Sequence, residues 1–221
     1  MAEERIAIDG PKGAVSGVWA GDRGAPALVV APGAGATMET PLLVGFTRAL
    51  NDGGISTLRF NFPYQERGRR SPDSEAVLLG TWAAAFEAAR GRAGDGAVLA
   101  GGKSLGGRIA SIAVADGMPA SGLVFLGYPL HPPGKPERVR DQHLYRIEVP
   151  ILFLQGTADP FARPELMADV LERLGSRAEY VPVEGGDHSF RVRGQRADDR
   201  AIGADLAGAA ATFVRRVAGA G

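Results

Sequence analysis

The sequence predicts an α/β protein with a mostly parallel central sheet of about eight strands and helices on both faces. Two observations support this fold class. Short apolar segments that are typical of strands alternate with longer segments of helical pattern along most of the chain. Some of these strands, such as 27–31, are apolar throughout, as expected when both faces of a sheet are covered. No linker, repeat or change in composition divides the 221 residues, so residues 1–221 are expected to form a single domain.

Turn residues and hydrophobic periodicity define the individual elements. Two short strands at 4–8 and 14–20 surround a turn rich in Gly and Pro, and we expect them to pair antiparallel at one edge of the sheet. The remaining strands are predicted at 27–31, 55–60, 97–101, 123–126, 150–155 and 178–183, and helices at 39–52, 73–91, 107–116, 164–174 and 197–217. Between the strands at 123–126 and 150–155 there is room for a loop and one short helix at most. We therefore expect no cap domain and an open, shallow site.

The composition excludes several classes of protein. Acidic and basic residues are equal in number, 25 each, and are interspersed, so neither nucleic acid nor a membrane surface is an expected partner. The chain has no cysteine, which excludes disulfides, cysteine metal sites and a cysteine nucleophile. No secretory signal or membrane-spanning run is visible, and no metal-ligand spacing occurs. A cytoplasmic protein without metal or organic cofactor is expected.

Residues 102–106, Gly-Lys-Ser-Leu-Gly, carry the strongest functional motif. A predicted strand precedes them and a predicted helix follows, which places Ser104 on a sharp turn typical of the nucleophile elbow of α/β-hydrolases. Such a turn strains the serine backbone and leaves no room for a Cβ at the flanking positions. Because the chain contains 32 glycines, the motif alone is weak and depends on its partners.

A serine nucleophile needs a base and an acid that orients the base, in the chain order Ser, Asp or Glu, His. Asp159 follows the predicted strand 150–155, and His188, which follows the strand 178–183, is the only histidine beyond it. The carboxyl ends of parallel strands meet at one edge of a sheet, where such folds place their ligands. The sequence therefore predicts a catalytic triad of Ser104, Asp159 and His188.

The negative charge that develops on a substrate oxygen requires backbone N–H donors. We expect one from Leu105, at the start of the helix after the serine, and the other from Ala34, in the turn after the strand 27–31. Gly33, Tyr64 and Lys103 are further candidates to line the substrate site.

Other interpretations remain open for several of these residues. Ser104 could be an ordinary turn serine and His188 a solvated loop histidine. Asp159 could cap the helix at 164–174, although it lies five positions too early. Asp187 competes for the acid role, although turn chemistry is the expected one. Tyr64 could equally pack in the core, and Lys103 could point into solvent or pack on a neighbour.

Several linked motifs carry a family resemblance. They are Pro32-Gly-Ala-Gly-Ala36, Arg59-Phe-Asn-Phe-Pro-Tyr64, Gly101-Gly-Lys-Ser-Leu-Gly-Gly-Arg108, Leu126-Gly-Tyr-Pro-Leu-His-Pro-Pro-Gly-Lys135 and Gly156-Thr-Ala-Asp-Pro-Phe161. Together they resemble a bacterial α/β-hydrolase family that is related to the hydrolase-like domain of a eukaryotic histone-acetyltransferase complex subunit and lies near the dienelactone-hydrolase-like enzymes. The resemblance implies the α/β-hydrolase fold and the Ser104–Asp159–His188 triad, but no particular substrate. Dienelactone hydrolases proper use cysteine, so their activity is not carried over.

These observations predict a serine hydrolase of the carboxylesterase or thioesterase kind, which acts on a small or medium acyl ester or thioester through an acyl-enzyme. The alternatives are a non-catalytic interaction protein with the same fold, and an acyltransferase or peptidase that uses the same triad.

Overall fold

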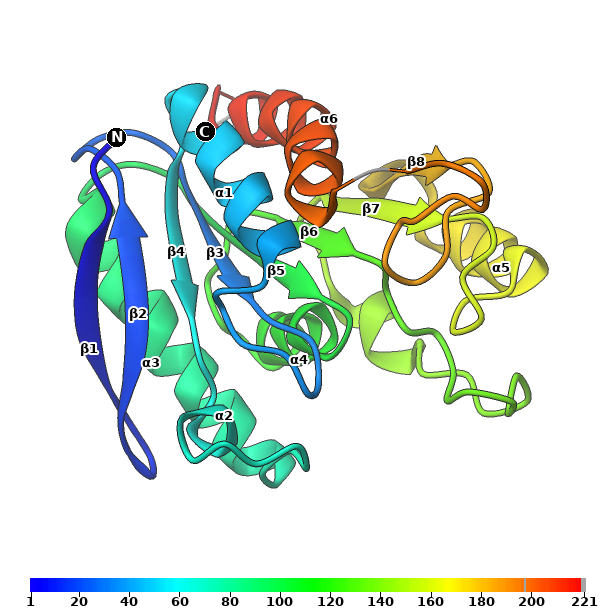
Figure 1. Ribbon diagram of the computed structural model, residues 1–221, viewed down its shortest axis with the longest axis horizontal. Helices are drawn as coiled ribbons and strands as arrows, with labels where there is room; N and C mark the ends of the chain where they lie inside the picture. The colour runs from blue at the N-terminus through cyan, green and yellow to red at the C-terminus, as the bar shows by residue number, and fades with distance from the viewer. Residues whose placement is uncertain (197, 220–221) are drawn as a thin grey trace.

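The computed structural model describes residues 1–196 and 198–219, and it contains one eight-stranded sheet (Figure 1). The strand order is β1-β2-β4-β3-β5-β6-β7-β8. The β1–β2 and β2–β4 pairs are antiparallel, and every other pair is parallel, which confirms the predicted mostly parallel sheet and its antiparallel edge. The strands are β1 (Glu4–Gly10), β2 (Gly13–Ala20), β3 (Ala27–Ala31), β4 (Ser56–Phe60), β5 (Val98–Lys103), β6 (Leu123–Leu126), β7 (Ile151–Gly156) and β8 (Ala178–Val183).

Helices cover both faces of the sheet. In Figure 1, α1 (Pro41–Asp52) and α6 (Asp199–Gly219) lie side by side on one face, where they pack against each other. The opposite face carries α3 (Glu75–Ala93) and α4 (Leu105–Ala115), which also contact each other, and α5 (Pro164–Leu174). Short helical segments occur at α2 (Pro63–Glu66), η1 (Gln142–Arg146) and η2 (Gly175–Arg177), the last two being 3₁₀ helices.

The core consists of two apolar layers that the sheet separates. Alternate residues of a strand point to opposite faces, so Val29 of β3 belongs to the layer under α3 and α4, while Leu28 and Val30 belong to the layer under α1 and α6. All five residues of β3 are buried. The central strands are apolar throughout for this reason, as the sequence pattern indicated.

The predicted elements are all present, with differences at their ends, and residue 197, the expected start of the last helix, lies outside the described residues. The strand expected at 97–101 continues to Lys103, and the helix expected from 107 begins at Leu105. Glycine has a low preference for strands and helices, so the glycines here weaken both assignments in the sequence. β3 and β6 pair with the end of β5, and this pairing overrides the low strand preference. Ser104 is therefore the only residue between strand and helix.

The segment between β6 and β7 contains the short η1 helix and no inserted domain. This agrees with the expected absence of a cap. Within the described residues, no helix is both long and apolar enough to cross a membrane.

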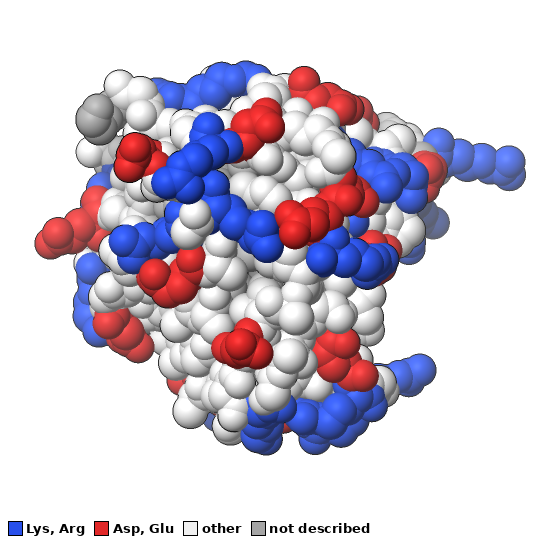
Figure 2. Space-filling model, turned by 90° about the vertical axis from the view of Figure 1, so that its left-hand side faces the viewer, with Lys and Arg blue, Asp and Glu red and all other residues white. Residues whose placement is uncertain are grey.

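Charged side chains are mixed on the face that Figure 2 shows, which is the left-hand side of Figure 1 near β1. Ion pairs among the described residues include Arg5 with Glu39 at 2.8 Å, Arg48 with Glu3 at 3.0 Å and Arg92 with Glu4 at 3.1 Å. Neither sign of charge dominates this surface.

Candidate catalytic site

Ser104 occupies the sharp turn between β5 and α4. Its backbone has φ 51° and ψ −115°, and only one other non-glycine residue of the described chain, Phe190, has a positive φ. A positive φ strains a residue that carries a Cβ, and surrounding contacts must hold it in place. Here the Ser104 amide donates to the carbonyl of Leu126 in β6 at 3.1 Å, and the Ser104 carbonyl accepts the amide of Arg108 at 3.0 Å.

Two glycines make this turn possible, because both face the carbonyl oxygen of Ala31 in β3. A Cβ on Gly102 would lie 2.3 Å from that oxygen, and one on Gly106 would lie 2.4 Å from it. Contacts of this length are far inside van der Waals separation. The motif glycines are thus required by the close approach of β3 to the turn.

The structure brings the three predicted triad residues together at the carboxyl ends of β5, β7 and β8. His188 Nε2 lies 2.9 Å from Ser104 Oγ, and His188 Nδ1 lies 2.7 Å from Asp159 Oδ2. The Asp159 side chain is fully buried, while that of His188 is 22% exposed. The imidazole therefore connects the hydroxyl of the half-buried Ser104 to a buried carboxylate, which is the geometry that activates a serine.

The Asp159 carboxylate accepts two further hydrogen bonds. Gln155 Nε2 donates to Oδ2 at 2.7 Å, and the Phe161 amide donates to Oδ1 at 2.8 Å. The N-cap residue of α5 is Arg163, so Asp159 orders its own turn and does not cap that helix. The hydrogen bonds from Gln155 and Phe161 fix the orientation of the carboxylate toward His188.

Asp187 has a different role from Asp159. Its Oδ1 accepts the amides of Ser189 at 2.7 Å and Arg191 at 3.0 Å, which closes the turn that carries His188. The Phe161 ring packs against the imidazole, with 4.3 Å between ring centroids. Asp187 thus shapes the loop that carries His188, and Asp159 orients the His188 imidazole.

The two predicted oxyanion donors belong to different segments of the chain. Leu105 is the first residue of α4, and Ala34 is an exposed residue of the turn after β3. Within the described chain, neither amide has a backbone acceptor, so both N–H groups are free for a ligand. Gly33 lies directly against the site, since a Cβ there would be 3.5 Å from the Ser104 Cβ.

A model of the α/β-hydrolase domain family matches residues 24–216. The chain belongs to the α/β-hydrolase family. Its sheet order and its uncapped β6–β7 connection are those of this fold in its lidless form.

Solved structures support the same fold. Dienelactone hydrolase from Anabaena variabilis is 20% identical, with 97% of each chain covered and a TM-score of 0.77. A lidless α/β serine hydrolase from Xanthomonas campestris is 21% identical, with 98% of this chain and 95% of that chain covered and a TM-score of 0.72.

Tyr64 does not line the site of this hydrolase, contrary to expectation. Its side chain is fully buried, and its hydroxyl accepts a hydrogen bond from Gln65 Nε2 at 3.0 Å. The same amide of Gln65 donates to the carbonyls of Gly33, at 3.2 Å, and Ala36. Tyr64 and Gln65 therefore support the loop that carries Ala34 and leave no tyrosine surface for a substrate.

Lys103 also differs from a substrate-lining residue. Part of the residue is accessible to solvent, but its Nζ is buried and points inward, toward the acids of the triad loops. An ammonium group that solvent cannot reach is not available to a substrate in the open site.

Gln65 and Gln155 were not recognised from the sequence. Gln155 is the one polar residue of the β7 sequence Ile-Leu-Phe-Leu-Gln. A polar residue at the end of a buried strand indicates a side chain that needs a hydrogen-bond partner near the site. Gln155 Oε1 accepts the amide of Tyr128 at 2.7 Å, so the side chain also connects β7 to the β6 end. Gln65 lies in the short α2 helix, which the sequence did not predict.

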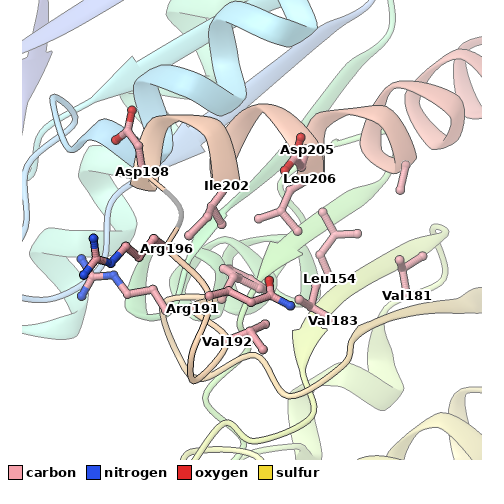
Figure 3. Close-up of a pocket in the computed structure, with 13 residues that line it drawn as sticks. Leu154, Val181, Val183, Arg191, Val192, Arg196, Asp198, Ile202, Asp205 and Leu206 are labelled. Atoms are coloured by element: carbon pink, nitrogen blue, oxygen red, sulfur yellow. The ribbon is translucent and has the colours of Figure 1, made fainter.

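A separate cavity of about 600 Å³ lies between α6 and the β7–β8 end of the sheet (Figure 3). Its apolar wall includes Leu154, Val181, Ile202 and Leu206, and Figure 3 shows them directed into one space. No triad residue lines it. It is distinct from the space above Ser104.

Proposed function

We propose that this α/β-hydrolase is a serine hydrolase that cleaves small or medium acyl esters or thioesters through an acyl-enzyme. The observation that carries the proposal is the continuous hydrogen-bonded chain from Ser104 Oγ through His188 to Asp159, with contacts of 2.9 and 2.7 Å. These three groups have the order and geometry required to make a hydroxyl nucleophilic.

In the first step, His188 Nε2 removes the Ser104 proton while Oγ attacks the carbonyl carbon of the acyl substrate. Asp159 stabilises the resulting imidazolium and holds Nδ1 protonated. The amides of Leu105 and Ala34 donate to the oxyanion of the tetrahedral intermediate. When that intermediate collapses, His188 protonates the departing alcohol or thiol, and the acyl group remains on Ser104.

In the second step, water replaces the leaving group. His188 removes a proton from the water, whose oxygen attacks the acyl-enzyme through a second tetrahedral intermediate held by the same two amides. His188 then returns the proton to Ser104 Oγ, and the carboxylic acid departs. The uncapped β6–β7 connection favours short acyl groups, because no inserted domain covers the serine to bury a long chain.

Labelling with a fluorophosphonate probe tests this proposal. The wild-type protein should be labelled at Ser104, and Ser104→Ala should abolish labelling. Ser71→Ala, at an exposed loop serine, is the matched control and should label like the wild type. Absence of labelling in folded wild-type protein would contradict the proposal.

Hydrolysis of p-nitrophenyl esters of increasing acyl length then tests the substrate class. We expect kcat/KM to be highest for acetate and butyrate esters and to decline for palmitate. A preference for palmitate would overturn the assignment to short acyl groups.

A further inference from the structure

Lys103, the residue before the serine, is a buried amine for which the hydrolytic mechanism has no use. Its Nζ is inaccessible to solvent and has no hydrogen-bond partner among the described residues. An unpaired ammonium in such a position loses its hydration, so a buried lysine of this kind needs compensation by other charges.

The Lys103 amine lies close to the triad, beside Gly127, which follows β6. A Cβ on Gly127 would lie 3.1 Å from Lys103 Nζ, 3.6 Å from Asp159 Oδ2 and 3.4 Å from the His188 carbonyl oxygen. The amine, the carboxylate and the carbonyl therefore surround the same small space. Only a residue without a side chain leaves that space open, and φ of +67° at this position also favours glycine.

The charged groups that face Lys103 come from both triad loops. Asp159 and Asp187 attract the ammonium, and the Phe190 ring lies with its centroid 5.8 Å from Nζ. Burial opposes these attractions and prevails, so the pKa of Lys103 falls to about 8. The amine is therefore mostly charged at neutral pH and loses its charge just above it.

We propose that Lys103 is a positioning residue whose buried positive charge, acting beside Asp159, opposes protonation of His188. This inference rests on the proposed roles of His188 and Asp159. A cation next to the acid partially offsets the attraction between the carboxylate and an imidazolium.

The pH profile of kcat/KM for a short p-nitrophenyl ester tests this role. In Lys103→Met, the acid limb should move to higher pH by about half a pH unit, which makes kcat/KM about threefold lower on that limb. Lys103→Arg keeps the charge and should leave the acid limb close to that of the wild type. A merely structural role would instead lower kcat/KM at every pH without moving the limb, and that result would overturn the proposal.

Histidine NMR gives a readout that requires no activity. The imidazole of His188, assigned by its loss in His188→Gln, should titrate at higher pH in Lys103→Met than in the wild type. In the wild type alone, its chemical shifts should show a second inflection near pH 8, where Lys103 loses its proton. Absence of this inflection, with an unmoved His188 titration in Lys103→Met, would refute the role of Lys103. A failure of ester hydrolysis with the NMR changes present would refute only the proposed function.

Discussion

Gln155 donates a hydrogen bond of 2.7 Å to Oδ2 of Asp159, the same oxygen that faces His188 Nδ1. Both side chains are buried, and Gln155 is held in turn by the Tyr128 amide, which donates to its Oε1 at 2.7 Å. The orientation of the acid therefore depends on an amide that cannot contact substrate.

Replacing Gln155 should impair hydrolysis while the triad residues remain. Gln155→Leu removes a hydrogen bond to a buried carboxylate and leaves the Tyr128 amide without its acceptor. Hydrogen bonds to charged groups contribute about 1.5–3 kcal/mol, so we expect a loss of roughly 10- to 100-fold in kcat/KM. Steady-state kinetics on a short p-nitrophenyl ester measures the effect, and Gln142→Leu, on the exposed face of η1, is the control. Equal activity of both variants would show that Gln155 does not position Asp159.

The two acids near His188 should respond differently to amide substitution. Asp159→Asn replaces the carboxylate that faces Nδ1 and should lower kcat by about 10³- to 10⁴-fold. Asp187→Asn retains a side-chain oxygen that can accept the amides of Ser189 and Arg191, so activity should stay within about fivefold of the wild type. If Asp187→Asn were the inactive variant, the assignment of the acid would be wrong.

Two helical glycines should respond to alanine in opposite directions. Gly106→Ala places a Cβ 2.4 Å from the Ala31 carbonyl oxygen, and we expect it to destabilise the protein by several kcal/mol or to prevent folding. Gly91→Ala on α3 meets nothing within 4 Å and should stabilise by about 0.5–1 kcal/mol, because alanine favours helix. Thermal unfolding measures both. A stable Gly106→Ala protein would contradict the close packing of the serine turn against β3.

Lowering the pH should decrease the stability of the fold, because His143 becomes protonated. Burial, together with the charges of Arg108 and Arg146, lowers the pKa of His143 to about 4 from a usual value of 6.5. Between these values the unfolded chain binds more protons than the folded one, so stability is lost as the pH falls from 6.5 to 4.

Partial exposure of His143 limits this contribution to on the order of 2 kcal/mol. Urea unfolding at several pH values should show a flatter curve over this window for His143→Gln than for the wild type. The carboxylates titrate in both proteins, so the difference between the curves isolates His143. Parallel curves would refute the prediction.

The sequence determined the fold class and the candidate triad residues, because strand and helix patterns are local. Apolar strands alternate with helices, and parallel strands bring the residues after their carboxyl ends to one edge, so Ser104, Asp159 and His188 could be named from their places after predicted strands. The glycines around Ser104 are likewise explained by a turn that the motif already indicated.

Only the tertiary structure decided what surrounds those residues. Gln65 contacts the carbonyl of Gly33, which lies far from it along the chain, and Gln155 links Asp159, four residues on, to the distant amide of Tyr128. The direction of each side chain depends on packing between strands. Tyr64 is the clearest case, since its place after a strand suggested a substrate contact, whereas burial turns its hydroxyl toward Gln65. A periodic pattern specifies which residues reach the sheet edge, but the contacts made there depend on side-chain packing that no local pattern encodes.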